Sequence, residues 1–317
     1  MVTQDHTDPN STQDNILNLP PRRPGNVKYI LYYLRHKPLG TIGVSICTIM
    51  ILTAIFANLI APHTYQEQNY EALKQSPSLD FLFGTDNFGR DIFSRVVHGA
   101  RISMMVGFLA VVVGTGVGAV VGLASGFFMG KFDALVQRII DMWMSFPDLI
   151  LALTIVAVFG NTVPNVILAI AATILPRGVR VIRSNTLAIR EMDYTLAARA
   201  IGASNRRIML RHVMPNTVAP FLIIMSSMFG TAILTEAGLS YLGLGISEPT
   251  PSWGRMLTGQ AAQYLSTAPW MLVFPGVAIT MTVMGFAFAG DALRLSLIHI
   301  SEPTRRTPIS YAVFCLK

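Results

Sequence analysis

The sequence predicts an all-α integral membrane protein with six transmembrane helices and with both termini in the cytoplasm. Hydrophobic residues make up 52% of the 317 residues and charged residues 13%, and the mean hydropathy is +0.50. A soluble domain carries about 25% charged residues, so this composition excludes an ordinary soluble fold. Apolar runs of roughly 20 residues, the length that crosses a bilayer, recur along the chain. Basic residues gather in alternate loops.

A polar tail, residues 1–36, precedes the first apolar run and is expected to lie in the cytoplasm. The tail is too polar, and the run that follows it too long, for a cleaved signal peptide. Spans are predicted at 40–61, 102–128, 139–160, 163–182, 216–235 with a weaker extension to about 245, and 269–290. Together they form one membrane domain over residues 37–294.

The second predicted span carries glycines at every fourth position: Gly114, Gly118, Gly122, Gly126 and Gly130. Residues four apart share one face of a helix, so these glycines form a smooth strip that another helix can approach closely. We expect packing within the chain. Dimerisation or a pore-facing strip remains the alternative.

Charge marks the ends of the third and fourth predicted spans. Asp141, Pro147 and Asp148 lie near the start of the third, and Arg177 and Arg180 mark where the fourth approaches water. Counted over the loops, fifteen Lys and Arg residues fall on one side of the membrane and five on the other. The positive-inside rule therefore places both termini in the cytoplasm. The net charge of +7 reflects these loops rather than a nucleic-acid partner.

Catalytic and cofactor motifs are absent from the sequence. It contains no GxxxxGK[ST], HExxH or GxSxG pattern, and Cys47 and Cys315 form no ligand spacing. The chain therefore has no visible means of hydrolysing ATP, and it offers no metal site. Acidic residues fall near the predicted span ends, as Glu236 does, and not deep inside the spans. Because coupled carriers place ionisable groups within their spans, this weighs against a stand-alone secondary carrier.

The cytoplasmic stretch 190–215 has the pattern of two short helices joined by a turn. Asp193 suits a helix N-terminus, and Gly202 can adopt the left-handed conformation that stops a helix. Ser204 or Asn205 can then cap a second helix, and Pro215 precedes the next span. The apolar face of the first helix is expected to consist of Tyr194, Leu196, Ala197, Ala200 and Ile201.

This stretch resembles the EAA signature of bacterial ABC importer permeases. Ala197 and Ala198, three further residues, Gly202, twelve further residues and Pro215 match its spacing, although Leu196 stands where that family has Glu. The resemblance implies a coupling helix that docks on an ATPase subunit. The residues expected to couple to that subunit are Tyr194, Ala197, Ala198, Ala200, Gly202, Ala203, Ser204, Arg206, Arg207 and Pro215.

Three more segments resemble the dipeptide/oligopeptide/nickel branch of that family, closest to its C-type permease subunit. They are Phe83–Arg95, Gly99–Ser103, and Leu234–Gly245 followed by Pro249–Gly254, the last expected to be an extracytoplasmic turn. On the residues alone, Asp86 would cap a helix starting at Asn87, and Glu236 would be a hydrogen-bonded acid at the membrane interface.

The resemblance implies a type I ABC importer permease fold in the bacterial inner membrane. Its expected partners are a homologous B-type permease subunit, two ABC ATPase subunits and an extracytoplasmic substrate-binding protein, within the lipid bilayer. The chain itself would hold no cofactor and would not be an enzyme, since ATP and Mg belong to the ATPase subunits. The expected cargo is di- or oligopeptides. Nickel or another small solute is the alternative.

The last segment, residues 295–317, departs from the family pattern. Family members continue after Arg294 with an Asp-rich ending, whereas this chain continues as Leu295-Ser296-Leu297-Ile298 and so on to Lys317. The segment resembles translated sequencing-adapter DNA. We therefore predict that it is not native sequence, with a genuine short cytoplasmic tail as the alternative.

Overall fold

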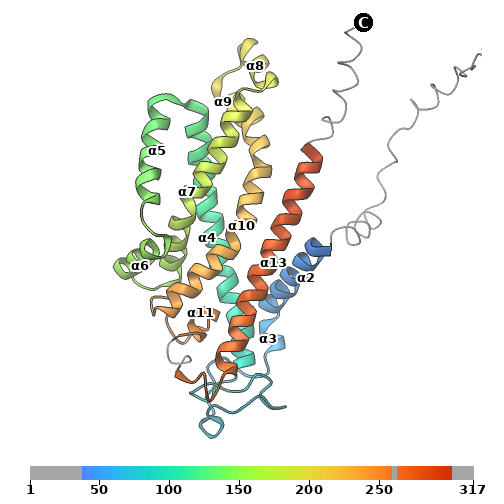
Figure 1. The fold of residues 1–317 in the computed structure, drawn as a ribbon, viewed down its shortest axis with the longest axis vertical. Coiled ribbons are helices and arrows are strands. Elements are labelled where there is room, and N and C mark those ends of the chain that lie inside the picture. The colour runs from blue at the N-terminus through green and yellow to red at the C-terminus, as the bar shows by residue number, and fades with distance from the viewer. Residues whose placement is uncertain (1–37, 259–262, 302–317) are drawn as a thin grey trace, which may run out of the picture.

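The computed structural model describes residues 38–258 and 263–301, with side chains up to Arg294 (Figure 1). The predicted tail 1–36 and residues 302–317 lie outside the described residues. Within the described part the chain is helical and forms no strand. The helices are α2 (Pro38–Ile55), α3 (Ala57–Ile60), α4 (Ile92–Phe128), α5 (Gly130–Met144), α6 (Asp148–Phe159), α7 (Val163–Arg190), α8 (Asp193–Ala200), α9 (Asn205–Ile208), α10 (Met214–Tyr241), α11 (Trp253–Met256) and α13 (Trp270–Ser301), with short turns η2 (Tyr70–Ala72) and η3 (Met209–Val213).

Five helical stretches are long and apolar enough to cross a membrane. They are α2, α4, α7, the continuous run Asn205–Tyr241, and the Trp270–Arg294 part of α13. A sixth exists if α5 and α6, which meet at an angle of 87°, count as one broken span. The predicted all-helical membrane fold is confirmed, and the third span is the one that departs from a straight helix. Pro147, which has no N–H to donate to the ladder, stands at that bend.

The predicted start of the second span and the predicted end of the fourth were both wrong. The second span was placed from residue 102, but α4 begins at Ile92, because Asp91 caps it by accepting from the backbone N–H groups of Phe93 and Ser94. The fourth was ended at 182, but α7 continues to Arg190. Arg183 and Arg190, beyond the predicted end, therefore lie on the helix as well.

The glycine strip packs α4 against α7. A β carbon on Gly114, Gly118, Gly122 or Gly126 would lie 2.5 to 2.9 Å from successive backbone carbonyl oxygens of α7, those of Ala171, Leu175, Val179 and Arg183. Because residue numbers rise together along both helices, α4 and α7 run parallel with their backbones in contact. Packing within the chain is thus confirmed for these four. Gly130 instead begins α5, and nothing lies near it.

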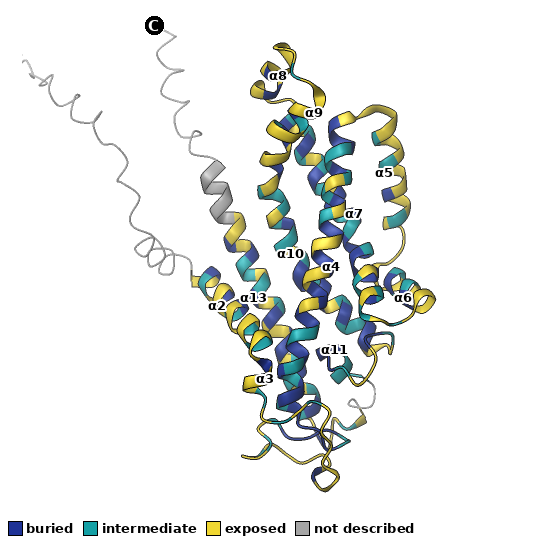
Figure 2. Cartoon of the chain, turned by 180° about the vertical axis from the view of Figure 1, so that it is seen from behind, coloured by how far each residue is buried: buried dark blue, intermediate teal, exposed yellow. Residues whose placement is uncertain are grey.

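The core of the bundle, its two edges and its two ends position the functional regions. The main core cluster lies between α4, α6, α7, α10 and α13, with Ile170, Ile174 and Ile233 among its buried side chains. In Figure 1, α5 and α6 form one edge of the bundle, and α2 and α13 form the opposite edge. The α8–α9 hairpin stands at one end, and the segment 61–91 with α11 closes the other. Buried residues are concentrated along α4 and α7, in the middle of the bundle (Figure 2).

Candidate functional site

The α8–α9 hairpin is built on a glycine turn. Gly202 has φ +82°, a left-handed conformation that residues with a side chain rarely adopt. Its N–H donates to the Arg199 carbonyl at 3.0 Å, and the Ala203 N–H donates to the Ala198 carbonyl at 3.1 Å. These two bonds are the Schellman motif that ends a helix. Ser204 then caps α9, because its hydroxyl accepts from the Arg207 N–H at 3.4 Å. The predicted turn and cap are confirmed.

A small buried cluster attaches the hairpin to the spans. Ala198 and Ile208 pack with Phe127 of α4, Ile189 of α7 and Val213 of η3. Thr195 adds a bond across this junction, since its buried hydroxyl donates to the Ile189 carbonyl at 3.0 Å. The hairpin is therefore fixed to the ends of α4, α7 and α10 and would move with them. Sequence reasoning missed Thr195, although a threonine among alanines in a short helix is a visible signal.

The apolar residues of the hairpin point away from this cluster. Tyr194, Leu196 and Ile201 are exposed, Ile201 to 84%. Ala197, Ala200, Gly202 and Ser204 are exposed as well, and Ala203 is half-buried. A β carbon on Gly202 would meet nothing within 4 Å. The predicted apolar face thus exists, but nothing in the described chain covers it. Ala198 is the exception among the predicted coupling residues, because it is buried beneath the face.

The second helix of the hairpin was predicted as a separate element, and this was wrong. α9 continues through the π-helical turn η3 directly into α10, so that Asn205–Tyr241 is one span. Pro215 lies inside this continuous helix rather than before it. A proline removes one N–H and crowds the carbonyl four residues earlier, and a wider π turn just before it relieves that crowding. The exposed Arg206 and Arg207 form no ion pair among the described residues.

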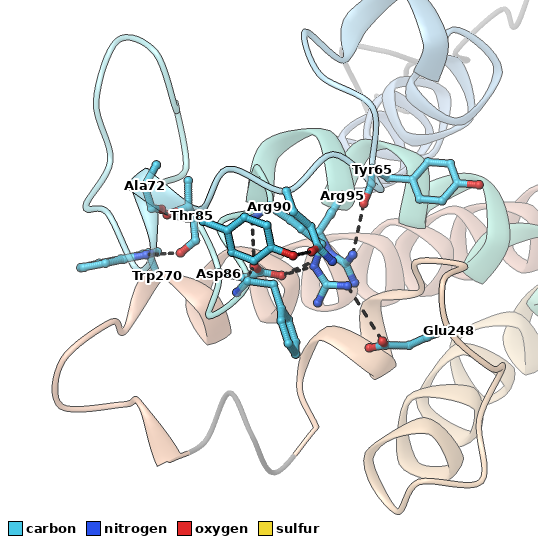
Figure 3. Close-up of polar contacts among 11 residues, drawn as sticks. Tyr65, Ala72, Thr85, Asp86, Arg90, Arg95, Glu248 and Trp270 are labelled. Carbon is cyan, nitrogen blue, oxygen red and sulfur yellow. Dashed lines mark hydrogen bonds and ion pairs between the residues drawn. The ribbon is translucent and has the colours of Figure 1, made fainter.

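At the opposite end, a buried polar cluster organises the segment before α4 (Figure 3). The Asp86 carboxylate accepts from the N–H of Phe88 at 2.8 Å and from the N–H and Nε of Arg90 at 2.9 and 2.6 Å. Arg95 lies 3.9 Å from the same carboxylate and donates to the Tyr65 carbonyl. Asp86 therefore closes a loop instead of capping a helix at Asn87, because the cap of α4 is Asp91.

Two tryptophans join this end to the rest of the fold. The Trp270 indole donates to the Thr85 carbonyl at 3.2 Å, and the Thr85 hydroxyl donates to the Ala72 carbonyl. The buried Trp253 of α11 donates from its indole to the Val96 carbonyl at 2.9 Å. Segments far apart in the sequence thus meet around the start of α4.

Glu236 is fully buried inside α10, one turn before its end. Its carboxylate accepts from the hydroxyls of Ser240 at 2.8 Å and Ser103 at 3.3 Å, and the Ser103 hydroxyl in turn accepts from the backbone N–H of Trp253 at 3.1 Å. The hydrogen-bonded acid is confirmed, and Glu236 lies near the end of its span as expected, although inside α10 and not just beyond it. Residues 234–241 were expected in an extracytoplasmic turn, yet they form the last turns of α10, and the turn begins at Leu242.

Comparisons with known proteins agree on one family. Residues 114–298 match the family model described as binding-protein-dependent transport system inner membrane component, and residues 27–77 match the N-terminal TM domain of oligopeptide transport permease C. The chain is 42% identical over 264 residues to the dipeptide transport system permease protein DppC of Alkalihalophilus pseudofirmus, covering 83% of this chain and 86% of that protein. It is 43% identical over 250 residues to the glutathione transport system permease protein GsiD of Escherichia coli, covering 78% and 82%. The same figures hold for GsiD of Shigella boydii.

Proposed function

Because this chain belongs to the family of binding-protein-dependent transport inner membrane components, with an OppC-type N-terminal segment, we propose that its α8–α9 hairpin receives the motion of an ATPase subunit. The chain is a multi-pass inner membrane permease subunit of an ABC importer of the peptide-transporting kind, and it is not itself an enzyme. It needs no cofactor. A separate ATPase, a binding protein and a partner permease complete the system.

The observation that carries the proposal is an exposed apolar face on a firmly attached base. Tyr194, Leu196 and Ile201 are apolar side chains left in water at the tip, whereas Ala198 and Ile208 fix the hairpin to the bundle. Small exposed residues beside them let a partner backbone approach. A face of this kind marks a protein interface. A rigid hairpin joined to three helices would carry a displacement into the spans.

We further propose the assembly and the cargo. One copy of this chain would pair with a homologous B-type permease, and each permease would dock on one of two ATPase subunits. The cargo would be a short peptide, in line with the dipeptide and glutathione named for the relatives. Nickel is less favoured, because the described residues hold no group of three or more His, Cys, Asp or Glu side chains suited to a metal ion.

Replacing Ile201 by aspartate tests the docking role. Burying a large apolar side chain stabilises an interface by roughly 1.5–3 kcal/mol, so a charge there should weaken docking by about tenfold or more. We expect the complete importer in proteoliposomes to lose both peptide uptake and ATPase stimulation by the loaded binding protein. Leu79→Asp is the control, because Leu79 is 98% exposed at the opposite end of the molecule. Normal coupling in Ile201→Asp would contradict the proposal.

A further inference from the structure

Charged side chains on the spanning helices collect where α7 faces α5 and the start of α6. Arg177 pairs with Asp148 at 2.6 Å, Arg180 with Asp141 at 2.7 Å, and Arg183 with Asp133 at 2.6 Å. The arginines ascend α7 every third residue, while their partners descend α5 toward α6, so the three pairs form a ladder. We call this set the ion-pair ladder. It lies along the α5–α6 edge of the bundle, away from α2 and α13 (Figure 1).

The pair Arg183–Asp133 differs from the other two. Its guanidinium makes two hydrogen bonds to the carboxylate, which also accepts from Ser125, and Ser125 accepts in turn from Gln137. The hydrogen-bonding groups of this pair are therefore used within the chain, and the pair holds α5 against α7. Arg177 and Arg180 instead make one hydrogen bond each to their acids, and their side chains are 41% and 49% exposed. Donors and acceptors on those two pairs therefore remain free to bind something else.

A cavity of about 270 Å³ opens beside the Arg177–Asp148 pair, at the 87° bend between α5 and α6. It is close in size to the smallest sites for small molecules, roughly 300 Å³. Its lining combines the Asp148–Arg177 pair with aromatic and small side chains, namely Trp143, Met144, Phe146, Pro147, Thr173 and Pro176. The indole N–H of Trp143 is buried, yet it has no hydrogen-bond partner in the described structure. A buried donor without a partner is costly and indicates a missing acceptor.

The ladder cannot face lipid. Exposed charges on a spanning helix are expensive in hydrocarbon and lie against a water-filled cavity or a protein partner. Other exposed positions on the spans include apolar ones that suit lipid, as at Val113 and Val120 on α4 and Val277 on α13. The α5–α7 edge is therefore the face of this subunit that meets water or a protein partner and not lipid.

We propose that the ion-pair ladder lines the translocation pathway and that its Arg177–Asp148 pair, with the adjoining cavity, binds a zwitterionic peptide in transit. Arg177 would bind the peptide carboxylate, Asp148 its ammonium group, and the Trp143 indole a main-chain carbonyl. Phe146 and Met144 would contact an apolar side chain. This inference rests on the proposed peptide cargo, and it assigns the permease a binding site of its own.

Neutralising the pair tests the site in the complete importer. We expect Arg177→Gln and Asp148→Asn each to lower dipeptide uptake by about tenfold, the scale of one charge-assisted hydrogen bond. ATPase stimulation by the loaded binding protein should stay near the wild-type value, because docking and coupling are untouched. The matched control is Arg138→Gln, which removes an exposed charge of α5 that forms no ion pair among the described residues.

A second measurement does not depend on how well these variants fold. A photoreactive phenylalanine analogue at Phe146 should crosslink to labelled dipeptide during turnover, and unlabelled dipeptide should compete better than its N-acetylated amide. Wild-type uptake in both neutralised variants, or a crosslink that free termini do not influence, would overturn the inference. If the wild-type importer takes up no dipeptide at all but imports another solute, the proposed cargo is wrong instead.

Discussion

Replacing Gly202 with residues of different size separates backbone strain from docking at the hairpin. Gly202 has φ +82°, and any residue with a β carbon pays about 1–2 kcal/mol for a left-handed conformation. Alanine, asparagine and tryptophan all carry that strain, with asparagine least affected. Since 1.4 kcal/mol corresponds to a factor of ten, Gly202→Ala should lower the population of the closed turn by roughly five- to thirtyfold relative to the open one.

Bulk acts separately from strain at this position. Within 4 Å of a β carbon on Gly202 the described chain places no atom, and the residue is exposed, so a larger side chain can leave the backbone here without a close contact. Gly202→Trp should therefore insert into the membrane like Gly202→Ala. If an ATPase subunit covers the hairpin, however, tryptophan should abolish coupling where alanine weakens it and asparagine nearly preserves it.

The assay is peptide uptake together with ATPase stimulation in proteoliposomes, with hydrogen exchange of residues 193–208 as the measure of the turn itself. Equal hydrogen exchange in the alanine and tryptophan variants, with activity lost only in the latter, would support docking. Equal activity in these two variants would refute it, because strain alone would then explain the whole effect.

Two further predictions concern packing and capping. Gly122→Val should prevent assembly of the bundle, because its β carbon would lie 2.5 Å from the Val179 carbonyl oxygen. Gly116→Val should be tolerated, because nothing lies within 4 Å of a β carbon there. The yield of folded permease after detergent extraction measures the difference, and equal yields would contradict the α4–α7 contact. Asp91→Ala should destabilise the start of α4 by about 0.5–2 kcal/mol through loss of the helix cap. Asp80→Ala, which removes an exposed acid of the same segment, should leave the stability unchanged. Thermal unfolding of the purified permease measures the difference, and unchanged stability in Asp91→Ala would exclude the capping role.

Much of the fold could be predicted because membrane insertion depends on local composition. Apolar runs located the spans, and the positions of Gly202 and Ser204 located the turn of the hairpin and its cap. Boundaries were less accurate, since a cap such as Asp91 or a pair such as Arg183–Asp133 lets a helix extend beyond its apolar part. The apolar face of α8 was predicted from its spacing, but spacing alone does not say whether such a face turns inward or outward.

Sequence by itself determined that the chain crosses a membrane, that it has no visible motif for ATP hydrolysis, and which loop resembles a coupling element. These properties follow from sums and spacings over neighbouring residues. Only the tertiary structure decided that Glu236 is held by serines of α4 and α10, and that the bend between α5 and α6 opens a cavity. It also paired three arginines with acids 29, 39 and 50 residues away. Such contacts depend on how whole helices pack, because a charge in a span is stable only where distant residues supply its partner.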